Sequence, residues 1–280
     1  MHLQWKKTRP TIEDRGPGEP ALAIVGGIHG DEPSGVRAVK RLLDADLSLQ
    51  RGVRFVVANP PAVEAGERYL DKDLNRVFPG DPDSSDREER LAARLCAATD
   101  GLPTLSIHST HSHSEPIALA SPEYPEVFRL AAQLPTPYVV NETPAVDGAF
   151  TACSTVVTLE AGCQHTDEAA ATAERQARAF LAVTGALDTP APAADPSFYR
   201  MDTPVEKPPA ESYSLQVANF EPVSEGAVYA STPTEDLVAE RPFVPILMSE
   251  CGYETIFGYQ GSVLGDTLSE AIDADPDSTL

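Results

Sequence analysis

The sequence predicts a layered α/β domain, in which a mostly parallel sheet carries helices on both faces, followed by a small β-rich unit. Segments typical of strands and of helices alternate over the first two thirds of the chain. Several strand segments, such as residues 156–159, are apolar without interruption, as strands covered on both faces are. The 280 residues, 41% of them hydrophobic, provide enough material for one large domain, or for a large and a small one.

The individual elements of the α/β part follow from these apolar runs and from helix-start signals. Pro33 suits the first position of a helix, Ser84 or Ser85 can cap the next long helix, and Thr166 can cap the last one. The predicted strands cover residues 21–25, 53–58, 105–108, 117–120, 138–140 and 155–159, and the predicted helices cover residues 33–43, 86–98, 125–134 and 167–184.

A proline-rich stretch follows the last of these helices. Its prolines forbid a continuous helix and indicate a boundary or an extended crossing segment. We therefore expect an α/β domain over residues 1–188, a boundary over 189–212 and a β-rich domain over 213–280. The strands of the last domain are expected near residues 213–217, 227–229 and 243–247, and its acidic tail from Asp273 is expected to be disordered.

Charge narrows the classes of partner. The net charge of −22 argues against binding to nucleic acid or to an anionic membrane, because phosphates would be repelled. Abundant acid with few lysines is typical of proteins that work in molar salt, where the ions screen self-repulsion. We expect a halophilic, cytoplasmic protein that could form a homo-oligomer. The alternative is an ordinary acidic cytosolic protein.

The first residues, the lengths of the apolar stretches and the cysteines are all consistent with the expectation of a cytoplasmic protein. The first residues lack the apolar core of a signal peptide, and no stretch approaches the roughly 18 apolar residues of a membrane span. The four cysteines form no C-x-x-C pair, so we expect reduced thiols.

Three polar side chains lie where predicted strands end, and their types are those of a catalytic zinc site. His29 and Glu32 come shortly after the first strand of the α/β part, and His108 ends the strand near residues 105–108. Two histidines and one glutamate leave the fourth position of a zinc ion to water, which is the catalytic rather than the structural pattern. His111 and His113 remain competing candidates for the third ligand.

Two further segments could act on a substrate beside such an ion. Residues 68–76 hold Arg68, Arg76 and Asn75 in an irregular stretch, and an arginine fork suits a carboxylate. Asp73 would orient an arginine or a metal-bound histidine. Glu160 follows an apolar strand, and desolvation there would raise its pKa and favour a general base. The alternative interpretations are a solvated charged loop and a surface glutamate.

Together, these segments resemble the succinylglutamate desuccinylase and aspartoacylase family of zinc amidohydrolases, which is related to zinc carboxypeptidases. The resemblance spans the first two thirds of the chain in motif order and extends more loosely to the β-rich end around residues 244–253. The matching motifs are Gly27-x-His29-Gly30-x-Glu32, Arg68-Tyr69-x-Asp71-x-Asp73-Leu74-Asn75-Arg76, the strand-borne His108, and Val157-Thr158-Leu159-Glu160-x-Gly162.

The resemblance implies a role for each matching residue. It makes Glu160 the general base that later protonates the leaving amine, and Arg68 the group that stabilises the oxyanion. Asn75 and Arg76 would hold the substrate carboxylate, and Tyr253 would reach the site from the β-rich domain. The implied zinc ligands, for one ion per chain, are His29, Glu32 and His108.

The chain departs from the aspartoacylase pattern where that pattern holds a second carboxylate. Aspartoacylases carry an arginine about ten residues before the catalytic glutamate and a lysine shortly after the tyrosine. Here residues 146–150 and 255–257 contain no cation. The prediction is therefore a zinc-dependent deacylase of a small, neutral or cationic N-acyl amino acid. The alternatives are a carboxypeptidase-like peptidase and a metal-retaining, non-catalytic binding protein.

Overall fold

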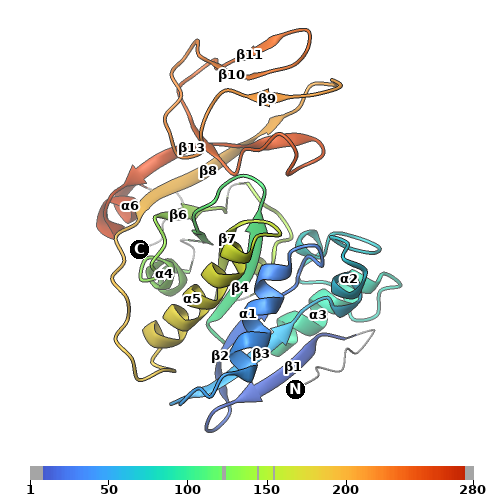
Figure 1. Cartoon of the computed structure of the whole chain (residues 1–280), viewed down its shortest axis with the longest axis vertical. Coiled ribbons are helices and arrows are strands. Elements are labelled where there is room, and N and C mark those ends of the chain that lie inside the picture. Colours follow the sequence, from blue (N-terminus) through green and yellow to red (C-terminus); the bar gives the residue numbers. More distant parts are fainter. Residues whose placement is uncertain (1–8, 122–123, 144, 154, 275–280) are drawn as a thin grey trace.

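The protein is built around one ten-stranded mixed sheet, shown in Figure 1. The computed structural model describes residues 9–121, 124–143, 145–153 and 155–274. In spatial order the strands are β1-β3-β2-β4-β7-β5-β6-β8-β13-β12, and β2, β3, β4 and β7 run parallel to one another. Their bounds are β1 Thr11–Arg15, β2 Pro20–Gly26, β3 Gly52–Val57, β4 Thr104–Thr110, β5 Ile117–Ala120, β6 Tyr138–Asn141, β7 Val156–Cys163, β8 Ser197–Glu206, β12 Val244–Ile246 and β13 Ile256–Gly265.

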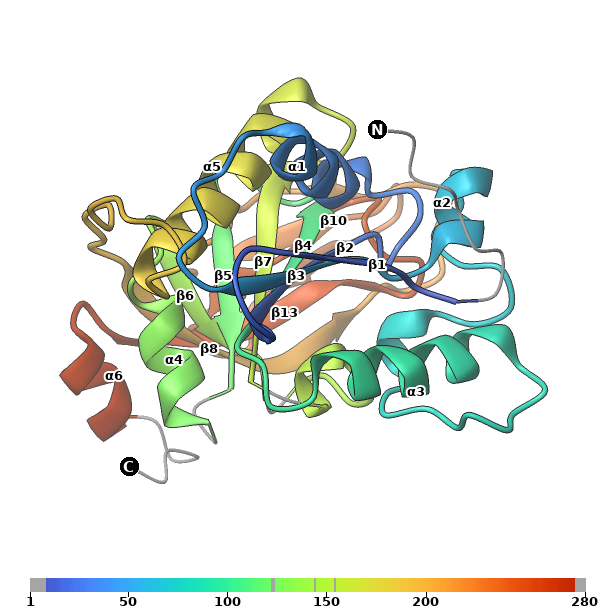
Figure 2. The same ribbon diagram turned by 90° about the horizontal axis from the view of Figure 1, so that it is seen from below.

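Helices cover both faces of the parallel part, as the uninterrupted apolar strands predict (Figure 2). Alternate residues of β2 face opposite ways, so Ile24 packs in the apolar cluster of α1 and α5, whereas Val25 packs in that of α3. The helices are α1 Pro33–Asp44, α2 Pro60–Ala65, α3 Arg87–Thr99, α4 Pro125–Ala131, α5 Asp167–Val183 and α6 Leu268–Ala274, with 3-10 turns η1 Leu74–Arg76 and η2 Phe150–Ala152. No described helix combines the length and apolar character that a membrane crossing needs.

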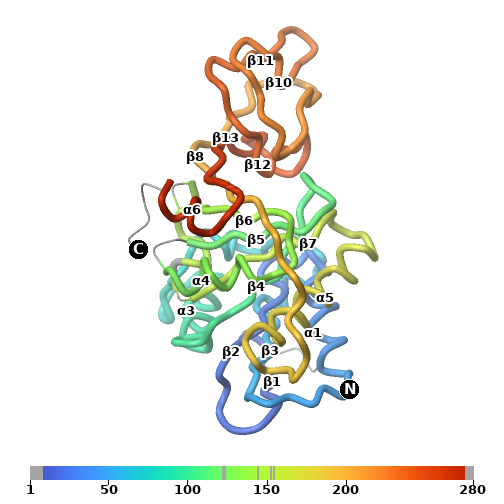
Figure 3. Tube along the Cα trace, turned by 90° about the vertical axis from the view of Figure 1, so that its left-hand side faces the viewer, coloured from blue at the N-terminus to red at the C-terminus, as the bar shows by residue number. Residues whose placement is uncertain are grey.

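A second sheet of three short strands lies beyond β8 and β13, at the far end of the molecule in Figures 1 and 3. Its order is β11-β10-β9, with bounds β9 Ser214–Leu215, β10 Val228–Ser231 and β11 Asp236–Val238. The apolar cluster around Val205, Phe243 and Phe257 joins this sheet to the large one. The segment after β12 returns from this cluster toward the carboxyl ends of the parallel strands.

Several expectations are corrected. The proline-rich stretch, predicted as a boundary or an extended crossing segment, is extended, but it forms a strand of the large sheet, β8. Pro204 is tolerated in β8 because it lies beyond the part that pairs with β6, so its missing N–H costs no bond on that side. Neither Ser84 nor Ser85 caps α3, whose N-cap is Asp86. Asp273 belongs to α6, while the last six residues of the predicted tail and the first eight of the chain lie outside the described part.

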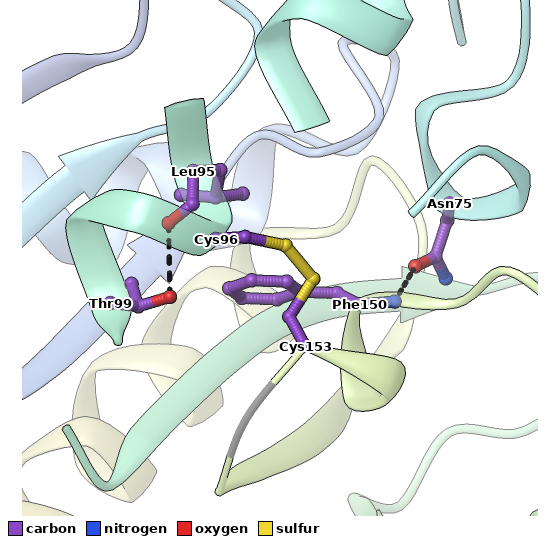
Figure 4. The surroundings of a disulfide bond; sticks show 6 residues. All are labelled: Asn75, Leu95, Cys96, Thr99, Phe150 and Cys153. Atoms are coloured by element: carbon purple, nitrogen blue, oxygen red, sulfur yellow. Dashed lines mark hydrogen bonds between the residues drawn. A yellow bond between two sulfur atoms is a disulfide. The ribbon is translucent and has the colours of Figure 1, made fainter. Parts of the chain in front are cut away.

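The cysteines are a further correction, because two of the four are not reduced thiols. Cys96 of α3 and Cys153 after η2 form a disulfide, with their Cα atoms 5.5 Å apart (Figure 4). The two residues are separated by 57 positions in the sequence, so only the packing of α3 against the segment after η2 reveals the pair. Cys163 and Cys251 are free.

Candidate metal centre

Three buried side chains meet at the carboxyl ends of neighbouring parallel strands. His29 and Glu32 occupy the turn between β2 and α1, and His108 lies on β4, which pairs directly with β2. The three residues are 3%, 4% and 2% exposed. The candidate ligand atoms of the three residues all lie within 4.8 Å of one another. The geometry therefore offers two imidazoles and a carboxylate to one ion.

The turn that carries His29 and Glu32 needs glycine on structural grounds. Gly27 has a φ of +71°, in the left-handed region that favours glycine. A Cβ atom at Gly30 would collide with the backbone of Ala62 at the start of α2. The N–H of Gly30 also donates to the carbonyl of Arg68 at 3.2 Å, which ties this turn to the 68–76 loop.

Charge complementarity holds the three groups together and suits a cation. The two Glu32 oxygens lie 2.6 Å from His29 Nδ1 and 3.0 Å from His108 Nδ1. Burial alone would lower the pKa of His29, but the carboxylates of Glu32 and Asp73 outweigh it and raise that pKa to about 9. Burial lowers the pKa of His108, whereas both histidines hold the pKa of Glu32 well below its usual range despite burial. The donor set of two imidazoles and one carboxylate fits zinc.

Asp73 orients two of the groups around this centre. Its Oδ1 lies 3.1 Å from His29 Nε2, the imidazole nitrogen that faces away from Glu32, and its Oδ2 accepts a 3.1 Å hydrogen bond from Arg68 Nε. Asp73 is thus bonded to both an arginine and a histidine. On the other histidine, Ser106 Oγ lies 3.1 Å from His108 Nε2. Partners of this kind fix the orientation of metal-binding imidazoles.

Arg68 and Glu160 face the same cleft as the three candidate ligands. A guanidinium nitrogen of Arg68 donates to Glu32 Oε1 at 3.2 Å. Glu160 pairs in register with His108 across β7 and β4, and its Oε2 is buried without a hydrogen-bond partner among the described residues. Burial and the nearby Glu32 carboxylate raise the pKa of Glu160. A carboxylate in this state is suited to take up a proton.

The other predicted substrate residues also line the cleft. Asn75 Oδ1 accepts a 2.9 Å hydrogen bond from the N–H of Phe150, so its amide nitrogen is left for other partners (Figure 4). Arg76 is exposed and follows it in η1. Tyr253 reaches the cleft from the segment after β12, and burial raises the pKa of its phenol, which keeps the O–H as a donor.

The competing histidines and distant arginines are placed differently. His111 lines the cleft but is outside the group of mutually close candidate ligands. His113 packs edge-on against Tyr138 and Phe220, with ring centroids 5.3 Å away in both cases. Arg200 and Arg241 of the C-terminal part line a separate depression beside Gln260, so they do not line the cleft of the candidate ligands.

Sequence reasoning missed one acidic residue of the cleft. Glu142 directly follows β6, is 7% exposed and lines the cleft. Burial raises its pKa to about 7, although Thr151 and Arg76 oppose this shift. The only signal in the sequence was an acidic residue after a short apolar run, the same signal that singled out Glu160.

The buried His29-Glu32-His108 group is a possible metal site at the carboxyl edge of an α/β sheet. Residues 18–187 match the model of the succinylglutamate desuccinylase/aspartoacylase catalytic domain. The chain belongs to this family.

Curated relatives and a solved structure agree with this assignment. The chain is 36% identical over 90 residues to a succinylglutamate desuccinylase of Pseudomonas fluorescens, covering 29% of this chain and 27% of that protein. It is 42% identical over 85 residues to an N-alpha-acetyl-L-2,4-diaminobutyric acid deacetylase of Halomonas elongata, covering 28% and 25%. These matches span about a quarter of each relative's length.

The fold extends further than these sequence matches. The crystal structure of a succinylglutamate desuccinylase/aspartoacylase from Rhodobacter sphaeroides superposes with a TM-score of 0.73 at 20% identity, covering 91% of this chain and 89% of that one. The common fold therefore includes the C-terminal part, beyond residues 18–187.

Proposed function

We propose that the protein is a zinc-dependent amidohydrolase that cleaves the acyl-amide bond of a small N-acyl amino acid. The observation that carries this proposal is the meeting of His29, Glu32 and His108 with Glu160 and Arg68 in one cleft. The relatives support the reaction type, but one name refers to a succinylated diacid and the other to an acetylated diamino acid. The side chain of the substrate is therefore a separate question.

Each residue has a role in this reaction. His29, Glu32 and His108 would hold one zinc ion, which when bound acidifies water and polarises a carbonyl. Glu160 takes the proton of the attacking water and later delivers it to the leaving amine nitrogen. Arg68 donates to the oxygen on which negative charge develops. The products are a carboxylic acid and a free amino acid.

The remaining groups bind the substrate. Asn75 and Arg76 would hold its carboxylate, and the protonated Tyr253 would donate a hydrogen bond from the opposite wall. Leu247 and Gly252, from the segment after β12, also line the cleft. A cleft covered in this way favours a small N-acyl amino acid over the extended peptide of a carboxypeptidase.

The decisive experiment measures amine release and metal content on the same protein. We expect wild-type protein to hold about one zinc per chain and to hydrolyse some members of a panel of N-acetyl and N-succinyl amino acids. Glu160→Gln should retain the metal yet lose several orders of magnitude in kcat. Glu126→Gln, which removes an exposed carboxylate on α4, is the matched control and should behave like the wild type.

Four outcomes would contradict the proposal or one of its assignments. Wild-type turnover by Glu160→Gln would exclude Glu160 as the base. Faster cleavage of peptides than of N-acyl amino acids would favour the peptidase alternative, and metal binding without any turnover would favour a binding protein. Loss of zinc in His111→Ala but not in His108→Ala would show that the third ligand is His111.

A further inference from the structure

Glu142 is a buried carboxylate that the proposed reaction does not use. It lines the cleft at 7% exposure, and Thr151 is its hydrogen-bonding neighbour. One of its two carboxylate oxygens, Oε1, is buried and has no hydrogen-bond partner among the described residues. A buried, unsatisfied carboxylate costs free energy, so its presence in a substrate cleft calls for a ligand group that compensates it.

The charges of the cleft determine what that group can be. Among the described residues that line it, the cations other than histidine are Arg68 and Arg76. Arg68 is already paired with Glu32 and Asp73 at 3.2 and 3.1 Å. Arg76 donates to the carbonyl of Asn75 at 2.7 Å, and its charge partly offsets the raised pKa of Glu142. Its other guanidinium N–H groups remain for one carboxylate of the substrate. The cleft can thus balance one negative group of a ligand, and Glu142 supplies a negative group of its own.

The walls near Glu142 are apolar. Leu119, Val146, Met201, Leu247 and Tyr259 all line the cleft and belong to one apolar cluster that bridges the large sheet and the segment after β12. Such walls favour methylene groups, and a carboxylate among them favours a charged donor. A ligand side chain that satisfies both is an alkyl stem that ends in an ammonium group.

We propose that Glu142 recognises the side-chain ammonium of the substrate, so that the preferred substrates are Nα-acyl derivatives of diamino acids. This inference rests on the proposed deacylase function and adds the substrate class to it. Arg76 would hold the α-carboxylate while Glu142 holds the ammonium, and the alkyl stem would lie against the apolar wall. A second carboxylate in the substrate side chain would instead meet Glu142 with the same sign of charge.

The experiment compares substrates that differ only in the terminal group of the side chain. Nα-acetylornithine is matched by Nα-acetylnorleucine, and Nα-acetyl-2,4-diaminobutyrate by Nα-acetylnorvaline, with N-acetylglutamate as the diacid. We expect wild-type kcat/KM to favour the ammonium member of a pair by about tenfold to a hundredfold, the range of a buried charge-assisted hydrogen bond. N-acetylglutamate should be the poorest substrate.

The variant Glu142→Gln keeps the size of the side chain and removes its charge, and the ratio of the two kcat/KM values is the readout. We expect this ratio to fall to about one. Glu126→Gln removes one exposed charge from the same acidic protein and should keep the wild-type ratio. All ratios are measured at low and at molar salt, because salt screens the surface field and leaves a buried pair largely intact.

The outcomes separate this inference from the function on which it rests. If no N-acyl amino acid is hydrolysed, the proposed function fails. If hydrolysis occurs without preference for the ammonium substrate, or if Glu142→Gln lowers both kcat/KM values in parallel and keeps the ratio, Glu142 only positions Arg76 and the inference is wrong. Hydrolysis of the neutral substrate by Glu142→Gln also shows that the variant is folded.

Discussion

The carboxylates in and around the candidate metal site differ in how many hydrogen bonds the protein itself offers them. Glu32 contacts two histidines, Arg68 and the N–H of Ser109, and Asp73 bonds to His29 and Arg68. Glu142 has Thr151 as a partner, and its Oε1 has no hydrogen-bond partner among the residues that the structure describes. The first two are held ionised by the fold, whereas the charge of Glu142 is left for a ligand.

This difference predicts how stability depends on pH. Burial raises the pKa of Glu142 from 4.5 to about 7, so between these values the folded state holds a proton that the unfolded state has released. Stability therefore falls as pH rises through this window. Glu142→Gln has no such proton. The free energy of unfolding of the variant relative to the wild type should increase by about 2–3 kcal/mol between pH 5 and pH 8.

The measurement is urea unfolding of both proteins at the two pH values. Contributions from groups whose pKa does not depend on Glu142, such as His29 and Asp73, are common to both proteins and cancel in the difference. Glu160 is the exception, because the charge of Glu142 raises its pKa, so the difference also includes this coupling. Glu126→Gln is again the control and should show a constant difference. A difference for Glu142→Gln that does not change with pH would mean that the carboxyl is ionised in the folded state throughout.

At this scale, the sequence could predict those residues whose types, position after a strand and motif context coincide. His29, Glu32, His108 and Glu160 were singled out in this way, and the structure brings them into one cleft. Glu142 also follows a strand, but it lies in none of the motifs that resemble the family. The first-turn acids of the helix over residues 86–98 were indistinguishable by sequence, although one of them, Glu88, is fully buried.

The 68–76 loop shows how one element is held by another. Glu88 of α3 accepts hydrogen bonds from the backbone N–H groups of Leu70, Asp71 and Lys72 at 3.0, 3.2 and 3.3 Å. This carboxylate thus accepts from N–H groups that have no helix or strand partner, because the loop between α2 and η1 has no regular secondary structure. The loop carries Arg68 at one end and Arg76 at the other.

Glu88→Gln should therefore loosen the loop without removing the metal. An amide presents one acceptor oxygen where the carboxylate presents two, and we expect a loss of about 1–3 kcal/mol in the free energy of unfolding. kcat/KM should fall by about tenfold or more, because Arg68 and Arg76 lose their support, while zinc content stays near one per chain.

The control for this prediction is one residue away. Glu89→Gln affects a carboxylate that pairs with Lys72 near the surface, so stability should change little. Loss of zinc from Glu88→Gln would contradict the prediction. It would show that Glu88 also stabilises the arrangement of the metal ligands, and not only the 68–76 loop.

Elements were predictable where periodicity and length agreed. Thr166 caps α5 as expected, with its Oγ accepting from the N–H of Ala169 at 3.0 Å. The short β1 and α2 were missed because five or six residues carry too little pattern. β8 was missed because prolines obscured a strand whose second half has a partner on one side only.

Over the whole molecule, β8, β13 and β12 of the C-terminal part extend the same sheet that carries the candidate metal centre. β8 pairs with β6 on one side and with β13 on the other, so the large sheet continues from the α/β part into the last third of the chain. Sequence patterns describe each strand separately and do not specify which strands become neighbours. That pairing brings Tyr253 and Leu247 to a cleft formed mainly by residues of the first two thirds.

The overall charge gives the last prediction, which concerns the stability of the whole chain in salt. A net charge of −22 on 280 residues repels itself most strongly in the compact state. Between 0.01 M and 1 M salt the Debye length falls from about 30 Å to about 3 Å, which removes most of this repulsion. We expect Tm to rise by several degrees over this range of potassium chloride, with most of the gain below about 0.5 M. Sucrose at equal osmolality is the control, because it favours compact states without screening charge. Sucrose should not reproduce a rise in Tm that occurs mostly at low concentration. A Tm that is constant in potassium chloride would show that the acidic surface costs the fold little, and would leave no physical reason for an adaptation to molar salt.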